Sequence, residues 1–289
     1  MLLFKARDQF VNYLKTKKRA EATLIAYSKD ILQLVEYLDK NGVKDSKNLK
    51  KADLEDFLKY LAENGYTKKT ISRKINAIKT FCKYVLEQNE MKEDPASSIM
   101  HPKLEQNAPR ILTRIEYRAL RDTVKDDVRT KAIVEILLQT GIKIHELANM
   151  KITDITFTAE NQPGVLHVRA SSSSGPREIP LNMAVQDAIR EYLKERPQSE
   201  LENLFVTKTG KSLLIRNIRA TLDRYFKQIN LNDITVNDLR HTFIAEHLVR
   251  GASVLLVSKI AGHKRLSTTE NYLKYIDRKE SGLGVLEEL

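Results

Sequence analysis

Residues 101–110, HPKLEQNAPR, interrupt a chain whose apolar residues otherwise recur mainly at helical spacing. Two prolines in this stretch prevent a continuous helix, and the apolar periodicity fades over the same residues. The sequence therefore predicts a linker at residues 101–110 that separates a domain of residues 1–100 from a domain of residues 111–289. A chain of 289 residues is long enough for two such domains, each with its own hydrophobic core.

The first domain has the pattern of amphipathic helices joined by short turns. Apolar residues recur at helical spacing over residues 27–38, and the turn signal Asn41-Gly42 follows them. Further helices are predicted after Asp53 and over residues 70–86. Six cations lie on or beside the last of these helices, away from its apolar face: Lys68, Lys69, Arg73, Lys74, Lys79 and Lys83.

The chain carries 49 Lys and Arg residues against 38 Asp and Glu residues, a net charge of +11. Both predicted domains are basic, so the surplus does not belong to a detachable tail. A surplus of this kind suggests a polyanionic partner, and nucleic acid is the usual one. A basic helix face is often only solvated, however, so charge alone leaves both interpretations open.

Several classes of protein are excluded by what the sequence lacks. Cys82 is the only cysteine and falls on the apolar face of the helix at residues 70–86, which excludes a disulfide scaffold and indicates a core position. No apolar run approaches the roughly 18 to 20 residues needed to cross a bilayer. The first residues, MLLFKARDQF, contain charges too early for a signal peptide. We therefore expect a soluble, cytoplasmic protein.

The second domain begins with helical signals and changes character near its middle. Thr113 and Glu116 have the spacing of a capping box, and an apolar helix predicted over residues 132–138 ends at Thr140-Gly141. Three strand-like segments follow, and the helical pattern returns from Met183 onward. The predicted fold class is therefore mainly α. Apolar residues alternate over residues 152–157, 165–169 and 177–181, and the turn sequences NQPG and SSSSG separate these segments. They predict a small three-stranded antiparallel sheet.

Polar and cationic residues of the types that act in catalysis lie close together in sequence near the end of the chain. The segment NDLRHTF begins a predicted helix with Arg240 in its first turn, where the positive end of the helix dipole favours a phosphate. The next helix is expected to end at a glycine and to leave His263 on a turn. Ser267 and Glu270 have capping-box spacing ahead of Tyr272. Together these residues indicate a phosphate held by Arg240 and His263 within reach of a phenol nucleophile.

The motifs TGIKIHEL, REIPL, NDLRHTF and IAGHKRLSTTENY stand in this order along the second domain, and they resemble those of the tyrosine recombinase, or phage integrase, family. The segments ATLIAYSKDILQLVEYL and TKKTISRKINAIKTFCKYV are similar to the core-binding domain of that family, and DPASSIMHPK is similar to its linker. The resemblance covers residues 5–278. It implies a two-domain DNA clamp, with a helical, SAM-like core-binding domain and an α-rich catalytic domain that contains the small sheet.

The resemblance also implies a reaction and a set of catalytic residues. Tyr272 matches the nucleophile that attacks the scissile phosphate and leaves a 3′-phosphotyrosyl bond and a free 5′-hydroxyl, without ATP, metal or another cofactor. Arg240 matches an arginine that binds the non-bridging oxygens, and His263 matches a residue that hydrogen-bonds the phosphate. Glu146 matches an acidic residue that orients the first catalytic arginine, and His241 matches a supporting neighbour of Arg240.

Three positions depart from the family's pattern. Lys143 stands at the first catalytic arginine and keeps the charge without the planar fork of arginine. Asn237 stands at the histidine of the HxLR motif, where an amide can still donate to a phosphate oxygen. Ser172 stands at the hairpin lysine when the strand is aligned through Arg177. That lysine is the family's general acid, so its loss is expected to slow cleavage by about 10²- to 10⁴-fold.

Three explanations for Ser172 remain open. Lys143 serves as the general acid itself, or Lys208 or Lys211 reaches the site from a neighbouring loop, or the protein is catalytically weakened by nature or by an altered loop. The third explanation leads to an alternative function, a DNA-binding architectural or regulatory relative without the reaction. Because Arg240, His263 and Tyr272 are all present, we favour an active site-specific recombinase.

The same resemblance implies partners. One partner is duplex DNA with inverted-repeat core sites. The other is the chain itself, because four copies form a homotetramer that exchanges strands through a Holliday junction. Residues 273–289 are expected to dock on a neighbouring protomer, and DNA contacts are expected from the six cations named above and from Arg177. Accessory DNA sites or proteins and association with the bacterial nucleoid fit this picture. The compact length favours an Xer-like enzyme or a transposon cointegrate resolvase, but the sequence leaves open the target site and the choice among integration, cointegrate resolution and chromosome-dimer resolution.

Overall fold

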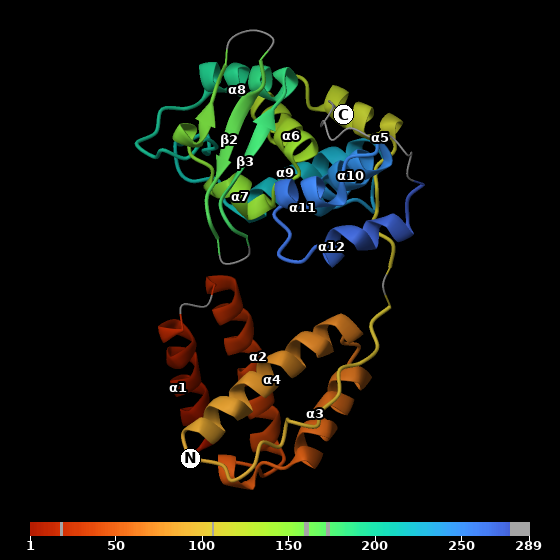
Figure 1. The fold of residues 1–289 in the computed structure, drawn as a ribbon. Coiled ribbons are helices and arrows are strands. Elements are labelled where there is room, and N and C mark those ends of the chain that lie inside the picture. Colours follow the sequence, from red (N-terminus) through yellow and green to blue (C-terminus); the bar gives the residue numbers. More distant parts are fainter. Residues whose placement is uncertain (18–19, 106, 159–161, 172–173, 278–289) are drawn as a thin grey trace. The chain divides into compact units, whose positions relative to one another are not determined.

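The computed structural model describes residues 1–17, 20–105, 107–158, 162–171 and 174–277. The chain divides into two compact units, Met1–Gln106 and Asn107–Leu289. Figure 1 shows the elements of each unit. Each unit has a separate hydrophobic core. Across the described ranges, no helix is both long enough and apolar enough to cross a membrane.

The first unit is a bundle of helices, as the periodicity predicted. Its helix α4 packs against the other three and contributes Ile75, Ile78, Phe81 and Cys82 to the core (Figure 1). Cys82 is fully buried, which confirms its predicted core position. The helices of this unit are α1 (Leu3–Thr16), α2 (Glu21–Lys40), α3 (Lys51–Glu63) and α4 (Lys68–Glu87), with a short 3-10 helix at Ser46–Asn48.

Lys74 corrects the prediction that all six cations near α4 lie on its surface. Its side chain is buried, and Nζ donates to Asp30 Oδ1 at 2.8 Å and to Gln33 Oε1 at 2.6 Å. Asp30 is itself 2% exposed, and it also accepts a hydrogen bond from Arg73. A buried lysine needs such partners because an unpaired charge is costly away from water. Lys74 therefore joins α2 to α4 and is not placed to meet DNA.

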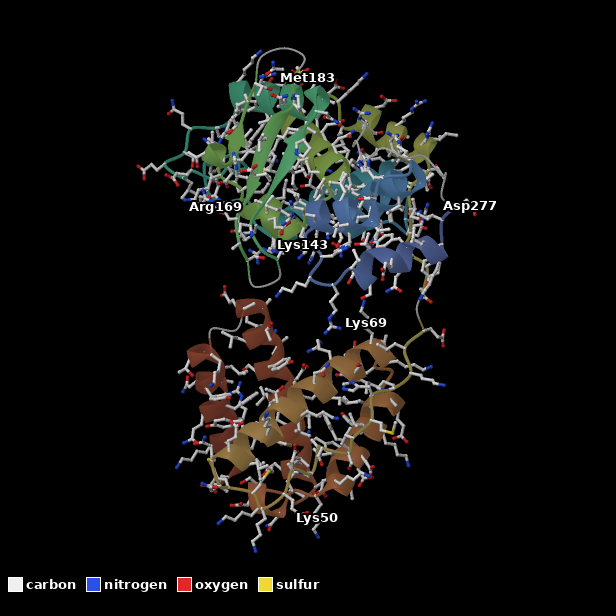
Figure 2. The ribbon with its side chains drawn as sticks, in the orientation of Figure 1. Lys50, Lys69, Lys143, Arg169, Met183 and Asp277 are labelled. Atoms are coloured by element: carbon white, nitrogen blue, oxygen red, sulfur yellow. The ribbon has the colours of Figure 1, made fainter. Side chains whose placement is uncertain are left out.

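The other five cations of this group remain at least partly accessible. Lys69 and Lys83 are exposed, and Figure 2 shows Lys69 near the start of α4. Arg73 keeps 44% of its side chain exposed beside Asp30. Lys68 lies 3.7 Å from a carboxylate oxygen of Glu105, and the half-buried Lys79 donates to the Ser97 carbonyl at 3.4 Å.

The second unit is built around helix α6, on which every residue from Ala132 to Thr140 is buried. A helix that is buried all round must have other elements packed on its several sides, and α5, α7, α8, α10 and the sheet all contact it. The elements of this unit are α5 (Arg114–Thr123), α6 (Val128–Thr140), α7 (Ile144–Asn149), a 3-10 helix (Ile152–Asp154), β1 (Ile155–Thr156), β2 (Gly164–Val168), β3 (Arg177–Leu181), α8 (Met183–Glu195), α9 (Ile215–Gln228), α10 (Val236–Val249), α11 (Val254–Ala261), α12 (Ser267–Glu270) and a 3-10 helix (Asn271–Lys274).

The predicted three-stranded antiparallel sheet is confirmed, in the order β1-β2-β3. Leu166 of β2 pairs with Ile155 of β1 and with Ile179 of β3, and all three side chains are buried. The first strand is shorter than the predicted residues 152–157, because residues 152–154 form a 3-10 turn. The Asp154 carboxylate stabilises that turn by accepting a hydrogen bond from the Lys151 backbone at 2.8 Å.

The predicted helix caps are confirmed in one case and wrong in another. The Thr113 hydroxyl accepts from the Glu116 backbone, while the Glu116 carboxylate accepts from the Thr113 backbone, so the capping box ahead of α5 is present. Ser267 does not cap a helix, because it is already the first residue of α12 and Leu266 precedes it in helical geometry.

Candidate active site

Arg240 is positioned by the start of helix α10. Thr235 and Asp238 form a capping box there, and α10 begins at Val236. Arg240 is therefore the fifth residue of the helix and lies in its second turn, not in the first turn as predicted. Its side chain is 9% exposed and donates to the Gly141 carbonyl. Burial lowers the pKa of the guanidinium to about 10, so Arg240 is still charged at neutral pH.

Gly141 allows this contact because it ends α6 in the left-handed conformation, with φ of 60°. A Cβ atom at this position would lie 2.2 Å from the Phe243 ring of α10. Glycine is thus required both by the backbone angle and by the close approach of α10. The tight turn after α6 presents the Gly141 carbonyl to Arg240 and brings Lys143 to the start of α7, where Figure 2 shows it.

Glu146 joins three segments through one buried carboxylate. Its Oε1 accepts from the Ser174 hydroxyl at 2.6 Å and from Arg177 at 2.9 Å, and its Oε2 accepts from Arg177 at 2.7 Å and from the Lys143 backbone at 2.9 Å. Burial alone raises the pKa of a carboxyl group, but the bonds from Arg177 and Ser174 outweigh it and lower the pKa of Glu146 to about 2. Glu146 is consequently a permanent anion at the edge of the site.

Arg177 has a different position from the one predicted. Only 4% of its side chain is exposed, and Nε donates to the Ile260 carbonyl at 2.6 Å while both terminal nitrogens bind Glu146. Arg177, which was predicted to contact DNA, instead faces the interior of the second unit and binds Glu146 there. Gly262 makes room for it, because a Cβ there would lie 2.8 Å from the guanidinium carbon. The strand alternation carried this signal, since Arg177 shares the inward parity of Ile179 and Leu181.

Tyr272 lies buried in the 3-10 helix Asn271–Lys274, 7% exposed. Its hydroxyl lies 2.5 Å from Nδ1 of His241, and the two ring centroids are 5.8 Å apart. Burial raises the pKa of the phenol to about 12, and the attraction of Arg240 opposes only part of that change. The sequence anticipated Tyr272 and His241 separately, but not that they form a hydrogen-bonded pair.

His263 follows α11 on the predicted turn. Gly262 ends the helix in the left-handed conformation, and Nδ1 of His263 lies 2.7 Å from the Thr269 hydroxyl. Burial, helped by the positive charges of Arg240 and Lys143, lowers the pKa of His263 to about 4. The ring is therefore neutral at neutral pH, when it offers one donor and one acceptor.

Lys143 is half-buried at the start of α7. Burial lowers the pKa of its ammonium group, and the charges of Arg240, Arg177 and Lys264 lower it further, while Glu146 acts in the opposite direction. A lysine with a lowered pKa gives up its proton more readily than an exposed one. This is the property that a general acid at neutral pH requires.

The remaining candidates are less central. Asn237 is exposed on the first turn of α10. Lys211 borders a pocket formed with Arg196 and Leu201, and Lys208 lies on the adjoining turn. Ser172 lies outside the described residues. Among the residues that are described, no group of three or more His, Cys, Asp or Glu side chains is arranged to hold a metal ion.

Arg240, His263, Tyr272, Lys143 and Glu146 thus come together from four separate segments of the second unit, close enough for their charges to act on one another. Two cationic side chains, a neutral imidazole and a buried phenol are suited to hold a phosphate diester and attack its phosphorus. The pairing of Ser174 and Arg177 with Glu146 was not predicted from the sequence.

Comparisons with known proteins identify the family of the chain. The profile of the Phage integrase family matches residues 105–278, and that of the phage integrase N-terminal SAM-like domain matches residues 8–89. The tyrosine recombinase XerC of Staphylococcus epidermidis is 32% identical over 277 residues, which cover 93% of this chain and 92% of the relative. XerC of Staphylococcus aureus is 31% identical over 275 residues, covering 92% and 90%.

Solved structures share the fold. The Tn1549 transposon integrase, in complex with a circular intermediate DNA, matches with a TM-score of 0.76 at 19% identity over 94% of this chain and 95% of that one. XerH recombinase bound to its difH substrate matches with a TM-score of 0.71 at 20% identity, over 86% of this chain and 75% of that one. The family profiles and the XerC relatives establish that the chain belongs to the phage integrase family of tyrosine recombinases, whose fold these structures share.

Proposed function

We propose that this protein is an active site-specific recombinase that cleaves and rejoins duplex DNA through a covalent bond to Tyr272. The observation that carries the proposal is that the buried Tyr272 is hydrogen-bonded to His241, the residue that directly follows the buried Arg240 on α10. The Tyr272 oxygen attacks the scissile phosphorus, a 3′-phosphotyrosyl bond forms, and the bond to the 5′ oxygen breaks. Because the covalent bond conserves the energy of the phosphodiester, rejoining needs no ATP.

Arg240 and His263 hold the phosphate in this proposal. Arg240 donates to non-bridging oxygens and stabilises the charge of the pentavalent transition state, and His263 donates a further hydrogen bond. Asn237 adds an amide donor from the first turn of α10. Glu146 does not touch the phosphate; it positions Lys143 by accepting from its backbone amide at 2.9 Å.

The test of this function is a trapping experiment. A duplex carrying a nick one or two nucleotides from the cleavage position loses the short 5′ fragment by diffusion, so cleavage cannot be reversed. Full-length protein incubated with such duplexes, made from the inverted repeats that it protects near its own gene, should form a covalent adduct whose DNA-linked peptide contains Tyr272. If the protected site yields no adduct, the protein is instead the non-catalytic DNA-binding relative.

Lys143 is assigned as the general acid that protonates the leaving 5′ oxygen. Replacing Lys143 with alanine is expected to slow adduct formation by about 10²- to 10⁴-fold, because the leaving group then departs as an unprotonated alkoxide. A substrate with sulfur in place of the 5′ bridging oxygen should restore most of the rate, since a thiolate leaves without a proton. Single-turnover kinetics on both substrates measure this.

The neighbouring candidates provide the controls for that assignment. Lys208→Ala and Lys211→Ala are expected to cleave the ordinary substrate at the wild-type rate. A Lys143→Ala variant that stays slow on the sulfur substrate would assign Lys143 to charge stabilisation alone. If Lys208→Ala or Lys211→Ala were the slow variant, and the sulfur substrate rescued it, the acid would lie on that loop.

The exposed cations of α4 are proposed to position the DNA backbone. Replacing Lys69 with methionine is expected to reduce the slope of log affinity against log salt by about 0.9, the loss of one phosphate contact. Lys74→Met is the matched control on the same helix, and its slope should not change because Nζ is held by Asp30 and Gln33. DNA-binding titrations at several salt concentrations measure the slope for each variant. Equal slopes for Lys69→Met and wild type would show that Lys69 does not contact the DNA.

The proposed partners extend beyond one DNA site. We propose that four protomers act on two inverted-repeat core sites in the cytoplasm and exchange strands through a Holliday junction, with or without accessory DNA sites or proteins. The tail proposed to couple neighbouring protomers, residues 273–289, is described only as far as residue 277; residues 278–289 lie outside the described part of the chain.

A further inference from the structure

A hydrogen bond joins the His241 imidazole to the Tyr272 phenol. The two atoms, Nδ1 and the phenol oxygen, are 2.5 Å apart, and the residues are separated by 31 positions in the sequence. His241 lies on α10, directly after Arg240, whereas Tyr272 lies in the 3-10 helix that follows α12. A contact between two elements at this distance fixes the direction of the phenol oxygen.

The position of His241 on its helix is also informative. Asn237 and His241 are four residues apart on α10, so their side chains lie on the same face, one turn apart. The amide of Asn237 is not a base and cannot take a proton from a phenol. An imidazole one turn further along the helix can, because its unprotonated nitrogen is an acceptor near neutral pH.

We propose that His241 is the general base for Tyr272, a role that rests on the proposed recombinase function. As the phenol oxygen attacks phosphorus, its proton moves to Nδ1 of His241 and the bond from phosphorus to the 5′ oxygen breaks. The leaving oxygen takes a proton from the general acid. In rejoining, the 5′-hydroxyl attacks the phosphotyrosine and gives its proton back to the general acid, while His241 returns its proton to the departing phenolate. Both groups are then in their starting protonation states.

The surroundings of both rings support this direction of transfer. Burial lowers the pKa of His241, and Arg240 lowers it further while Asp238 opposes the change, so the imidazole is neutral and able to accept. The titratable groups that face His241 from neighbouring segments are Tyr272 and the neutral His263. The phenol, with a pKa of about 12, is ionised in only about one molecule in 10⁵ at pH 7. A nucleophile so rarely ionised benefits from a base within hydrogen-bonding distance.

The experiment compares wild type with His241→Gln, which keeps a hydrogen-bonding group but cannot accept a proton. Full-length protein is tested in single turnover on the nicked trapping duplex. Adduct formation by His241→Gln is expected to be about 10²-fold slower or more, with DNA binding unchanged. A tyrosine fluorinated on the ring, introduced at position 272, ionises more readily; it should recover most of the loss in His241→Gln and change the wild-type rate little.

The matched control is His247→Gln, which removes another buried imidazole from α10, one that packs edge-on against Phe243. If His247→Gln slows adduct formation, the fluorinated tyrosine at position 272 should not restore the rate. If His241→Gln is slow without such recovery, the bond only positions Tyr272 and the proposal is overturned; a variant as fast as wild type, or faster, also overturns it. His241→Asn provides a second variant if His241→Gln does not fold. Should wild type itself form no adduct, the recombinase function has failed, and that outcome is distinct from these.

Discussion

Replacing Tyr272 with phenylalanine is expected to abolish the covalent protein–DNA adduct while leaving the fold and the affinity for DNA close to wild type. The substitution removes one oxygen, and that oxygen is the only atom of the side chain that can attack phosphorus. The ring is 7% exposed and keeps its packing. The lost hydrogen bond to His241 is expected to cost about 1 kcal/mol of unfolding free energy. Denaturing gels of the trapping reaction measure the adduct, and thermal unfolding measures the stability.

Tyr275 supplies the matched control, since it lies three residues further along the chain and is 37% exposed. Tyr275→Phe should form the adduct at the wild-type rate. The opposite result, in which Tyr272→Phe retains the adduct and Tyr275→Phe loses it, would move the nucleophile to Tyr275 and leave the pairing of His241 and Tyr272 without a catalytic meaning. The two variants together therefore decide which phenol reacts.

Much of the fold follows from local pattern. The helices of the first unit and the three strands of the second were predicted from periods of 3.6 and 2 in the apolar residues, because these periods decide which side chains can share one face. The ends of the helices and strands were predicted less accurately than their positions along the chain. At residues 152–154 the Asp154 carboxylate binds a backbone amide and forms a 3-10 turn in place of a longer strand. A side chain that competes with strand pairing in this way is not visible in apolar periodicity.

The candidate catalytic residues were predicted because the order of the motifs along the chain resembles that of a known family. The errors concern cations whose partner comes from a distant segment. Lys74 looks like a surface residue by composition, yet Asp30, 44 positions away, holds it in the interior. Arg177 is neutralised by Glu146, 31 positions away. Only the folded chain reveals such pairs, so a count of charges overestimates the number of cations that can reach DNA.

The pairing of Glu146 with Arg177 also bears on the residue at position 143. The Glu146 carboxylate is occupied by Arg177, by Ser174 and by the Lys143 backbone amide. Glu146 therefore already has an arginine partner, and it also accepts a hydrogen bond from the backbone amide of Lys143. We propose that Arg240 has the main role in binding the phosphate.

Arg240→Lys is accordingly expected to slow adduct formation by about 10³- to 10⁵-fold, the range over which a single transition-state arginine contributes in phosphoryl transfer. Lysine keeps one positive charge but loses the planar fork that binds two oxygens at once. Burial, which lowers the pKa of the Arg240 guanidinium, would also lower the pKa of a lysine ammonium group at this position. The wild-type guanidinium, with a pKa of about 10, is still charged at neutral pH.

Single-turnover rates on the nicked duplex, measured for wild type, Arg240→Lys and Arg240→Gln, separate charge from geometry. If charge alone matters, Arg240→Lys should be far faster than Arg240→Gln; we expect both to be slow, because the second oxygen contact is missing in each. DNA affinity should change little, since one buried cation among many contributes a small part of the backbone contacts. A loss of less than tenfold for Arg240→Lys would show that the phosphate is held elsewhere, with Lys143 as the next cation to replace.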